Sequence, residues 1–281
     1  ILRRYTVRPR LALLNPIIPS STYSMQVLVM LEELFEAVGA RVAIVEIDVS
    51  KVPFDDASLG HLYDGFIFPG SRASAYDLAQ YSWIKPMEET IRRLHAQRRP
   101  MLGICFGHQI ISQALGGRVE LNTKGIGAAS CAFDVLPLGA CLGLAKAPGR
   151  NAAAMLYHHN DIVSQLPTCA ANLACNAHCP AHASAVFGSA TEARMAVQRG
   201  ATSSSAKPHA ITLQGHPEFS TPTGAICLTA ILRECDAPKF GQQWLEEREA
   251  TVGDAATTAS AHAIARTAVK ILWPEAVPVT D

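Results

Sequence analysis

The sequence contains little charge and no apolar run long enough to cross a membrane. Only 17% of its 281 residues are charged, and Lys plus Arg balance Asp plus Glu at 24 each. A membrane-spanning helix needs about 20 consecutive apolar residues, and the apolar runs here are much shorter. No basic stripe with interleaved aromatics appears, although that pattern is typical of nucleic-acid binding. We therefore expect neither a membrane nor a nucleic acid as a partner.

Three further features are missing. No phosphate-binding loop of the form G-x-x-x-x-G-K-[ST] occurs, and we expect no cofactor. The basic N-terminal segment "ILRRYTVRPR" is not followed by a long apolar core, so a signal peptide is not expected. The eight cysteines are irregularly spaced and lie mostly in apolar surroundings. That usage is typical of reduced thiols rather than of a disulfide framework, and it predicts a cytoplasmic location.

The residues that are present alternate between strand-like and helix-like segments. Hydrophobic residues make up 49% of the chain, enough to bury a sizeable core. Short apolar runs, several of them β-branched, predict strands at 10–15, 41–48, 63–70, 100–104 and 210–215. Apolar residues at helical spacing predict helices at 24–39, from about Lys85 onward, and at 107–117, 223–234 and 259–273. Gly39 and Gly116 are the expected C-caps of the first and third helices.

Strands that alternate with helices predict an α/β fold, with a mostly parallel central sheet and helices on both faces. The segment 118–188 shows only short strands or loops. The small, polar segment 199–210 is interpreted as a mobile surface insertion, with a lid or a docking loop as the alternative. We expect a single domain over 1–281, with a core at about 11–235 and a C-terminal helical extension at 240–281.

The segment "GICFGHQ" places Cys105 between two glycines, after a predicted strand and before a predicted helix. Glycines on both sides permit the tight turn of a nucleophile elbow, which exposes the sulfur at the carboxyl end of the strand. The positive end of the following helix favours the thiolate form. The alternative is a buried packing cysteine with accidental glycine neighbours.

A thiol nucleophile needs a base and a group that orients the base. The segment "QGHPEF" offers His216 just after a predicted strand, and Glu218 two residues further on. In an extended segment these two side chains point the same way, so Glu218 can orient His216 while His216 faces Cys105. The alternative is an ordinary turn with a solvated carboxylate.

The segment "FPGS" offers an oxyanion site. The backbone N–H groups of Gly70 and Phe106 both lie at carboxyl ends of predicted strands, where ligands of such sheets gather. The alternative for Gly70 is a simple β-turn, which the Pro-Gly pair strongly favours.

Together, "GICFGHQ", "GHPEF" and "FPGSRASAYD" resemble the class I glutamine amidotransferases, a family with a Cys-His-Glu site. The resemblance covers roughly residues 11–230. The stretch "PGSRASAYDLAQYSWI" is most similar to free-standing members related to the glutaminase domain of GMP synthase, including γ-glutamyl peptidases. The resemblance implies a flavodoxin-like fold, with Cys105 as nucleophile, His216 as base and Glu218 as its partner.

The same resemblance implies a set of substrate contacts. Gln109, in the Cys-x-x-x-Gln position, would contact the bound glutamyl group, and Ser71 and Asp161 would also line the substrate site. The segment "HHND" at 158–161 matches a family segment usually written His-Gly-Asp. Here Asn160 replaces the glycine, which alters the local turn.

The implied reaction is cleavage of a γ-glutamyl amide bond through a γ-glutamyl thioester. The leaving group is ammonia if the substrate is glutamine, and an amine if it is a γ-glutamyl peptide. The polar "SRASAYD" loop after Gly70 and the absence of an acceptor domain favour an open cleft and a peptide substrate. The alternatives are a glutaminase subunit that delivers ammonia to a separate synthase, or a catalytically weak relative whose reactive cysteine has a regulatory role.

The segment "CNAHCPAH" resembles a metal site. Cys175, His178, Cys179 and His182, with Cys169 upstream, are residue types that bind zinc. Zinc sites usually pair ligands from two separated knuckles, however, and these four are adjacent in sequence. We therefore expect no metal.

Overall fold

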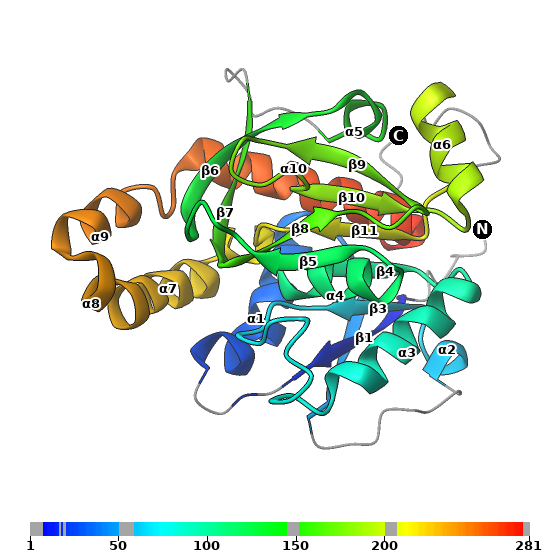
Figure 1. The fold of residues 1–281 in the computed structure, drawn as a ribbon, viewed down its shortest axis with the longest axis horizontal. Coiled ribbons are helices and arrows are strands. Elements are labelled where there is room, and N and C mark those ends of the chain that lie inside the picture. The colour runs from blue at the N-terminus through cyan, green and yellow to red at the C-terminus, as the bar shows by residue number, and fades with distance from the viewer. Residues whose placement is uncertain are drawn as a thin grey trace, which may run out of the picture.

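The structure is a computed structural model that describes residues 8–16, 18, 21–50, 59–144, 152–199 and 207–277. Most of the predicted surface insertion at 199–210 lies outside the described residues. The described part of the chain contains a nine-stranded sheet and a two-stranded ribbon (Figure 1). The strands of the large sheet are β1 (Arg10–Asn15), β2 (Ala43–Asp48), β3 (Gly65–Phe68), β4 (Met101–Ile104), β6 (Gly127–Val135), β7 (Ala153–His159), β9 (Ala170–Cys175), β10 (Ala183–Val186) and β11 (Ala210–Leu213).

The large sheet has the order β2-β1-β3-β4-β11-β10-β9-β6-β7. The pairings from β2 through β11 are parallel, and those from β11 to β7 are antiparallel. β11, the last strand in sequence, therefore lies between the two halves. Its Leu213 pairs with Ile104 at the end of β4, which brings the segments after both strands to one edge of the sheet. The ribbon pairs β5 (Arg118–Leu121) with β8 (Asp161–Gln165).

Helices cover both faces of the sheet, as predicted. They are α1 (Thr22–Ala37), α2 (Leu59–Leu62), α3 (Ile84–Ala96), α4 (Phe106–Ala114), α5 (Pro137–Cys141), α6 (Ala190–Arg199), α7 (Pro222–Ile231), α8 (Ala237–Phe240), α9 (Gln242–Glu249) and α10 (Ala255–Leu272). Alternate residues of β1 point to opposite faces. Leu11 and Leu13 pack with α1, α7 and α10, whereas Ala12 and Leu14 pack with α3 and α4.

Two glycines end helices in the way the sequence predicts. Gly39 after α1 and Gly116 after α4 both have φ in the left-handed region, at +74° and +92°. The N–H of Ala40 donates to the Phe35 carbonyl, and that of Gly117 to the Ser112 carbonyl. These bonds satisfy carbonyls that the helix ends would otherwise leave unpaired.

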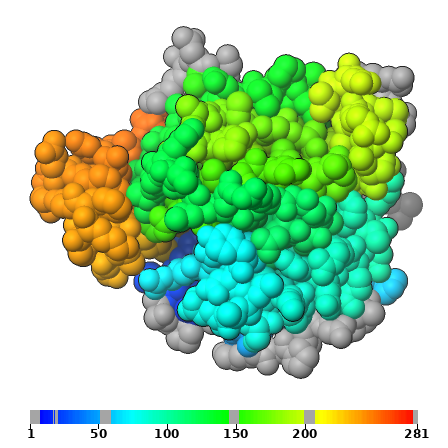
Figure 2. All heavy atoms as spheres, in the orientation of Figure 1, coloured from blue at the N-terminus to red at the C-terminus, as the bar shows by residue number. Residues whose placement is uncertain are grey.

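The C-terminal part contains two different kinds of structure. α10 runs along the sheet behind β9, β10 and β11 (Figure 1), and its buried side chains join the same core cluster as α1. α8 and α9 instead project from the body of the molecule, and the surface is hollowed where they meet the rest of the chain (Figure 2). Among the described residues, no helix has the length and apolar character needed to span a bilayer.

Candidate active site

Cys105 occupies the turn between β4 and α4. Its φ of +52° and ψ of −102° lie outside the common regions for a residue with a side chain. Its N–H donates to the Leu213 carbonyl at 2.8 Å, which ties the turn to β11. Cys105 is 5% exposed. A strained backbone between a strand and a helix is the geometry of a nucleophile elbow, as the sequence predicts.

The two flanking glycines are required by close backbone approaches. A Cβ on Gly107 would overlap the carbonyl oxygen of Phe68 and lie 2.6 Å from its carbonyl carbon. A Cβ on Gly103 would lie 2.7 Å from the carbonyl oxygen of Gly107. Both glycines therefore allow α4 to pack directly on β3 and β4 behind Cys105.

His216 and Glu218 form a buried pair. Nδ1 of His216 lies 2.7 Å from Oε1 of Glu218, and the two residues are 3% and 0% exposed. The pairing agrees with the sequence analysis, but its predicted local geometry is wrong. Residues Pro217–Ser220 form a 3₁₀ helix, η1, rather than an extended segment. The carboxylate thus reaches His216 from a tight helical turn that Pro217 begins.

The surroundings of His216 favour its cationic form. Burial lowers the pKa of His216, but the negative charges of Glu218 and Cys105 and the hydrogen bonds to both raise the pKa to about 10. The ring also stacks on Phe219 at a centroid distance of 4.3 Å. The cationic imidazole therefore lies in contact with the Cys105 side chain.

Tyr23, at the start of α1, is a further member of this network that the sequence analysis missed. Its hydroxyl donates to Oε1 of Glu218 at 2.8 Å and accepts the Gly70 N–H at 3.1 Å. Its ring meets His216 edge-on at 5.4 Å. Burial and the charge of Glu218 raise the pKa of Tyr23 well above its usual value, so the hydroxyl keeps its proton. Tyr23 directly precedes the helix predicted at 24–39, and nothing in the local sequence indicates this contact.

The two predicted oxyanion donors lie at the site. Phe106 is the first residue of α4, directly after Cys105. A Cβ on Gly70 would lie 2.8 Å from Cε1 of His216, so this glycine borders His216. Because the Gly70 N–H donates to Tyr23, it would have to exchange that hydrogen bond to hold an oxyanion. The role of both donors stays a prediction.

The three residues expected to contact substrate all border the same cavity as Cys105. Gln109 donates to the backbone carbonyl of Asp161 at 2.9 Å. The Asp161 carboxylate accepts from the hydroxyls of Ser74 at 2.6 Å and Tyr76 at 2.9 Å. Ser71 accepts from the Ala73 N–H at 3.2 Å. Asp161 therefore fastens the loop after Gly70 to the turn after β7, and its direct contact with substrate stays a prediction.

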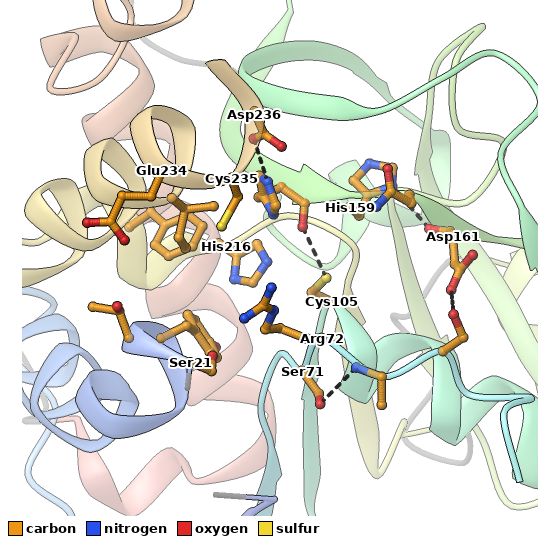
Figure 3. Close-up of a pocket in the computed structure, with 18 of the residues that line it drawn as sticks. Ser21, Ser71, Arg72, Cys105, His159, Asp161, His216, Glu234, Cys235 and Asp236 are labelled. Carbon is orange, nitrogen blue, oxygen red and sulfur yellow. Dashed lines mark hydrogen bonds and ion pairs between the residues drawn. The ribbon is translucent and has the colours of Figure 1, made fainter. Parts of the chain in front are cut away.

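The cavity that contains Cys105 has a volume of about 320 Å³. Its walls come from the start of α1, the loop after Gly70, the turn after β7 and residues 231–239. The last wall includes a π-helix, η2 (Leu232–Asp236), a geometry often found at functional sites. Oδ2 of Asp236 lies 2.8 Å from Nε2 of His158, whose carbonyl accepts from the Cys105 thiol at 3.7 Å (Figure 3).

The segment that resembles a zinc site is dispersed in the structure. His182 pairs with the Tyr157 hydroxyl at 2.6 Å, and His178 with the Asn122 side chain at 2.9 Å. The Cys179 thiol donates to the Ala181 carbonyl. Within the described ranges, no three His, Cys, Asp or Glu side chains come together in a way that could hold a metal ion.

A family model described as "Glutamine amidotransferase class-I" matches residues 23–229, well over half of the chain. The chain belongs to this family. The matched range includes Tyr23 and the candidate triad, but it ends before the wall formed by Glu234 to Lys239. The chain therefore builds part of its cavity from residues beyond the family match.

Relatives and solved structures agree with this assignment. The chain is 29% identical over 162 residues to γ-glutamyl peptidase 3 of Arabidopsis thaliana, covering 56% of this chain and 55% of that protein. It is 27% identical over 205 residues to γ-glutamyl peptidase 5 of the same plant, covering 72% and 70%. The chain thus spans about half the length of the first relative. The fold resembles a glutamine amidotransferase from Thermotoga maritima, with a TM-score of 0.68, 16% identity and coverage of 95% and 98%.

Proposed function

We propose that this chain hydrolyses γ-glutamyl amide bonds, with Cys105 as nucleophile, His216 as acid and base, and Glu218 as the group that orients His216. The observation that carries the proposal is the buried His216–Glu218 pair, joined at 2.7 Å beside a cysteine on a strained elbow. This arrangement supplies a nucleophile, a base and an orienting acid in one place.

In the proposed mechanism, the Cys105 sulfur bonds to the side-chain carbonyl carbon of the γ-glutamyl group. Negative charge develops on the carbonyl oxygen, where the N–H groups of Phe106 and Gly70 stabilise it. His216 gives its proton to the departing nitrogen as the carbon–nitrogen bond breaks, which leaves a γ-glutamyl thioester. Water then loses a proton to His216 and attacks the thioester, and the carbon–sulfur bond breaks to release glutamate and return the thiolate.

We favour γ-glutamyl peptides over glutamine as substrates. The γ-glutamyl peptidase relatives support this choice, as does a cavity of about 320 Å³ that extends from Cys105 to the wall at Glu234–Lys239. Glutamine hydrolysis needs room only for ammonia beside the glutamyl group, whereas a peptidase needs space for the departing residues. The eight free thiols support a reducing compartment, and we propose the cytoplasm.

Steady-state kinetics on glutamine, glutathione and a γ-glutamyl dipeptide test the proposal. We expect hydrolysis of the peptides at a rate at least comparable to that of glutamine. Cys105→Ala should abolish turnover and His216→Ala nearly so, whereas Glu218→Gln should cost less because it orients rather than transfers protons. Cys141→Ala, at an exposed thiol, is the matched control.

Two results would contradict the proposal. Near-normal activity of His216→Ala would remove the mechanism. Strong activity on glutamine with none on either peptide would instead support the alternative, a glutaminase subunit that delivers ammonia to a separate synthase. In that case the isolated chain should be slow and should accelerate when the synthase is added.

A further inference from the structure

The cavity has two ends, and they lie on opposite sides of Cys105 (Figure 3). Asp161 and His159 lie on one side, and Gln109 belongs there because it donates to the Asp161 carbonyl at 2.9 Å. His216 lies on the other side, with Ser21, Glu234 and Cys235 beyond it. In the proposed reaction the departing nitrogen takes its proton from His216. The leaving group must therefore occupy the His216 end.

Arg72 points its guanidinium into this end of the cavity, toward His216 and Cys105 (Figure 3). It follows Ser71 in the loop after Gly70, which Asp161 fastens through Ser74 at 2.6 Å and Tyr76 at 2.9 Å. Before Arg72, the Gly70 N–H donates to the Tyr23 hydroxyl at 3.1 Å, so the loop is held on both sides of the residue. An anchored guanidinium presents a planar set of donors that matches a carboxylate.

The charges around the His216 end suit an anionic ligand. A second cation, Lys239 on α8, lines the same cavity. The Asp236 carboxylate is hydrogen-bonded to His158 at 2.8 Å. The Glu218 carboxylate is hydrogen-bonded to His216 at 2.7 Å and to Tyr23 at 2.8 Å. The Glu234 side chain also lines this end and is solvent-exposed. Ammonia, the leaving group from glutamine, carries no negative charge, so two cations here would not stabilise it.

We propose that Arg72, assisted by Lys239, binds the free carboxylate of the departing amino acid. The inference rests on the proposed function and narrows its substrate class. The preferred substrates are γ-glutamyl peptides whose leaving amine carries a carboxylate, rather than glutamine or γ-glutamyl amides without one. Arg72 supplies the two-point contact close to the reacting bond, and Lys239 adds attraction at the rim.

A matched pair of substrates isolates this contact. γ-Glutamylglycine and γ-glutamylglycinamide have nearly the same size and differ in the carboxylate alone. We expect kcat/KM to favour γ-glutamylglycine by about 10- to 100-fold, the effect typical of a hydrogen-bonded charge. Arg72→Ala should remove that preference mainly through KM, and change kcat/KM for the glycinamide by less than about 3-fold.

Conservative and control variants complete the design. Arg72→Lys should retain part of the preference, because it keeps the positive charge but loses the planar pair of donors that binds a carboxylate at two points. Lys239→Ala should reduce the preference by a few-fold, because an exposed cation contributes less. Arg194, on α6, is hydrogen-bonded to Thr191. Arg194→Ala is the control for loss of a surface arginine, and it should leave kcat/KM unchanged for both substrates. Equal losses on both substrates in Arg72→Ala, or no preference in the unaltered protein, would overturn the inference.

Binding measurements separate this inference from the proposed function. Cys105→Ala should bind γ-glutamylglycine more tightly than γ-glutamylglycinamide in calorimetry, and adding Arg72→Ala should abolish the difference. If the unaltered protein turns over neither compound while this difference persists, the proposed hydrolysis is wrong and the carboxylate site stands. If the two ligands bind equally, or neither binds, the carboxylate site is wrong.

Discussion

The protonation of His216 is set by its charged neighbours. Its pKa of about 10 lies far above its usual value of 6.5, because the charges of Glu218 and Cys105 outweigh its burial. A raised pKa means that the imidazolium is present below pH 10 and is lost as the pH rises through that value. In the proposed reaction, the proton that His216 gives to the leaving group is therefore available throughout the neutral range.

Replacement of Glu218 by glutamine should lower the pH at which activity is lost on the alkaline side. The change removes the largest contribution that raises the pKa of His216, so the alkaline limb of kcat/KM should move toward 6.5 by at least about one pH unit. Tyr23→Phe is the matched control, because it removes a hydrogen bond to Glu218 and keeps the charge. An alkaline limb that stays in place in Glu218→Gln would show that Glu218 does not set this pKa.

Cys105 should react first with iodoacetamide among the eight cysteines. The cationic His216 beside it favours the thiolate, whereas burial raises the pKa of Cys179 and of Cys227 to about 12. Mass mapping after limited treatment measures the order of labelling. Exposed Cys141 provides the internal standard for a thiol reached freely by the reagent. Faster labelling of Cys141 than of Cys105 would contradict the expected activation.

At the scale of secondary structure, α4 depends on its contact with β3. Gly107→Ala should cost at least about 3 kcal/mol of unfolding free energy, because its Cβ would overlap the Phe68 backbone, which cannot move aside cheaply. Gly116→Ala is the matched comparison at the other end of α4. No atom lies within 4 Å of its Cβ position, so only its φ of +92° opposes the change, at about 1 kcal/mol.

Urea unfolding of both variants gives the comparison directly. We expect Gly107→Ala to lose more unfolding free energy than Gly116→Ala. If Gly107→Ala does not fold, the yield of soluble protein relative to Gly116→Ala carries the same information. Equal midpoints would mean that α4 can shift away from β3 without cost.

Local pattern in the sequence predicts the elements that are regular and self-contained. β1 is predicted at its observed bounds because an apolar run ends at Pro16, and α1 ends before the glycine that caps it. α6 (Ala190–Arg199) was not predicted, since it is short and contains few large apolar residues. Patterns of this kind depend only on residues that are neighbours in sequence. They therefore identify strands and helix caps, which are set by neighbouring residues.

The candidate site was predictable where a motif is local, and unpredictable where the fold brings distant residues together. Cys105 has its glycines beside it, and His216 has Glu218 two residues away. Tyr23 reaches Glu218 across 195 positions, and His158 reaches Asp236 across 78. Neither contact leaves a trace in local spacing. The 3₁₀ turn at Pro217 was also not predicted, because the two-residue spacing of His216 and Glu218 fits an extended segment equally well.

At the scale of the whole molecule, buried neutral histidines should make the protein sensitive to acid. Burial lowers the pKa of four of them, to about 4 in His108 and His209 and to about 3 in His159 and His182. Between these values and 6.5 the unfolded chain binds more protons than the folded one. The stability that these four histidines contribute is therefore complete above pH 6.5 and falls as the pH decreases, by up to about 1.4 kcal/mol per pH unit for each histidine.

Thermal unfolding between pH 7 and 4 tests this expectation. Tm should fall steeply below about pH 6.5. His108→Gln should make the dependence shallower, whatever its effect on Tm at pH 7, and exposed His61→Gln should leave the slope unchanged. A Tm that is constant from pH 7 to 4 would contradict the assignment of neutral, buried rings.

The position of β11 has a consequence for how the protein acquires activity during synthesis. This strand is the last of the sheet to leave the ribosome, yet it lies between β4 and β10 and joins the parallel half to the antiparallel half. Cys105 is translated more than a hundred residues before His216. Until β11 inserts, a nascent chain carries Cys105 without His216 beside it, and the two halves of the sheet remain unjoined. Because such non-local pairing forms slowly, recovery of hydrolysis after denaturation should lag behind the recovery of helix content.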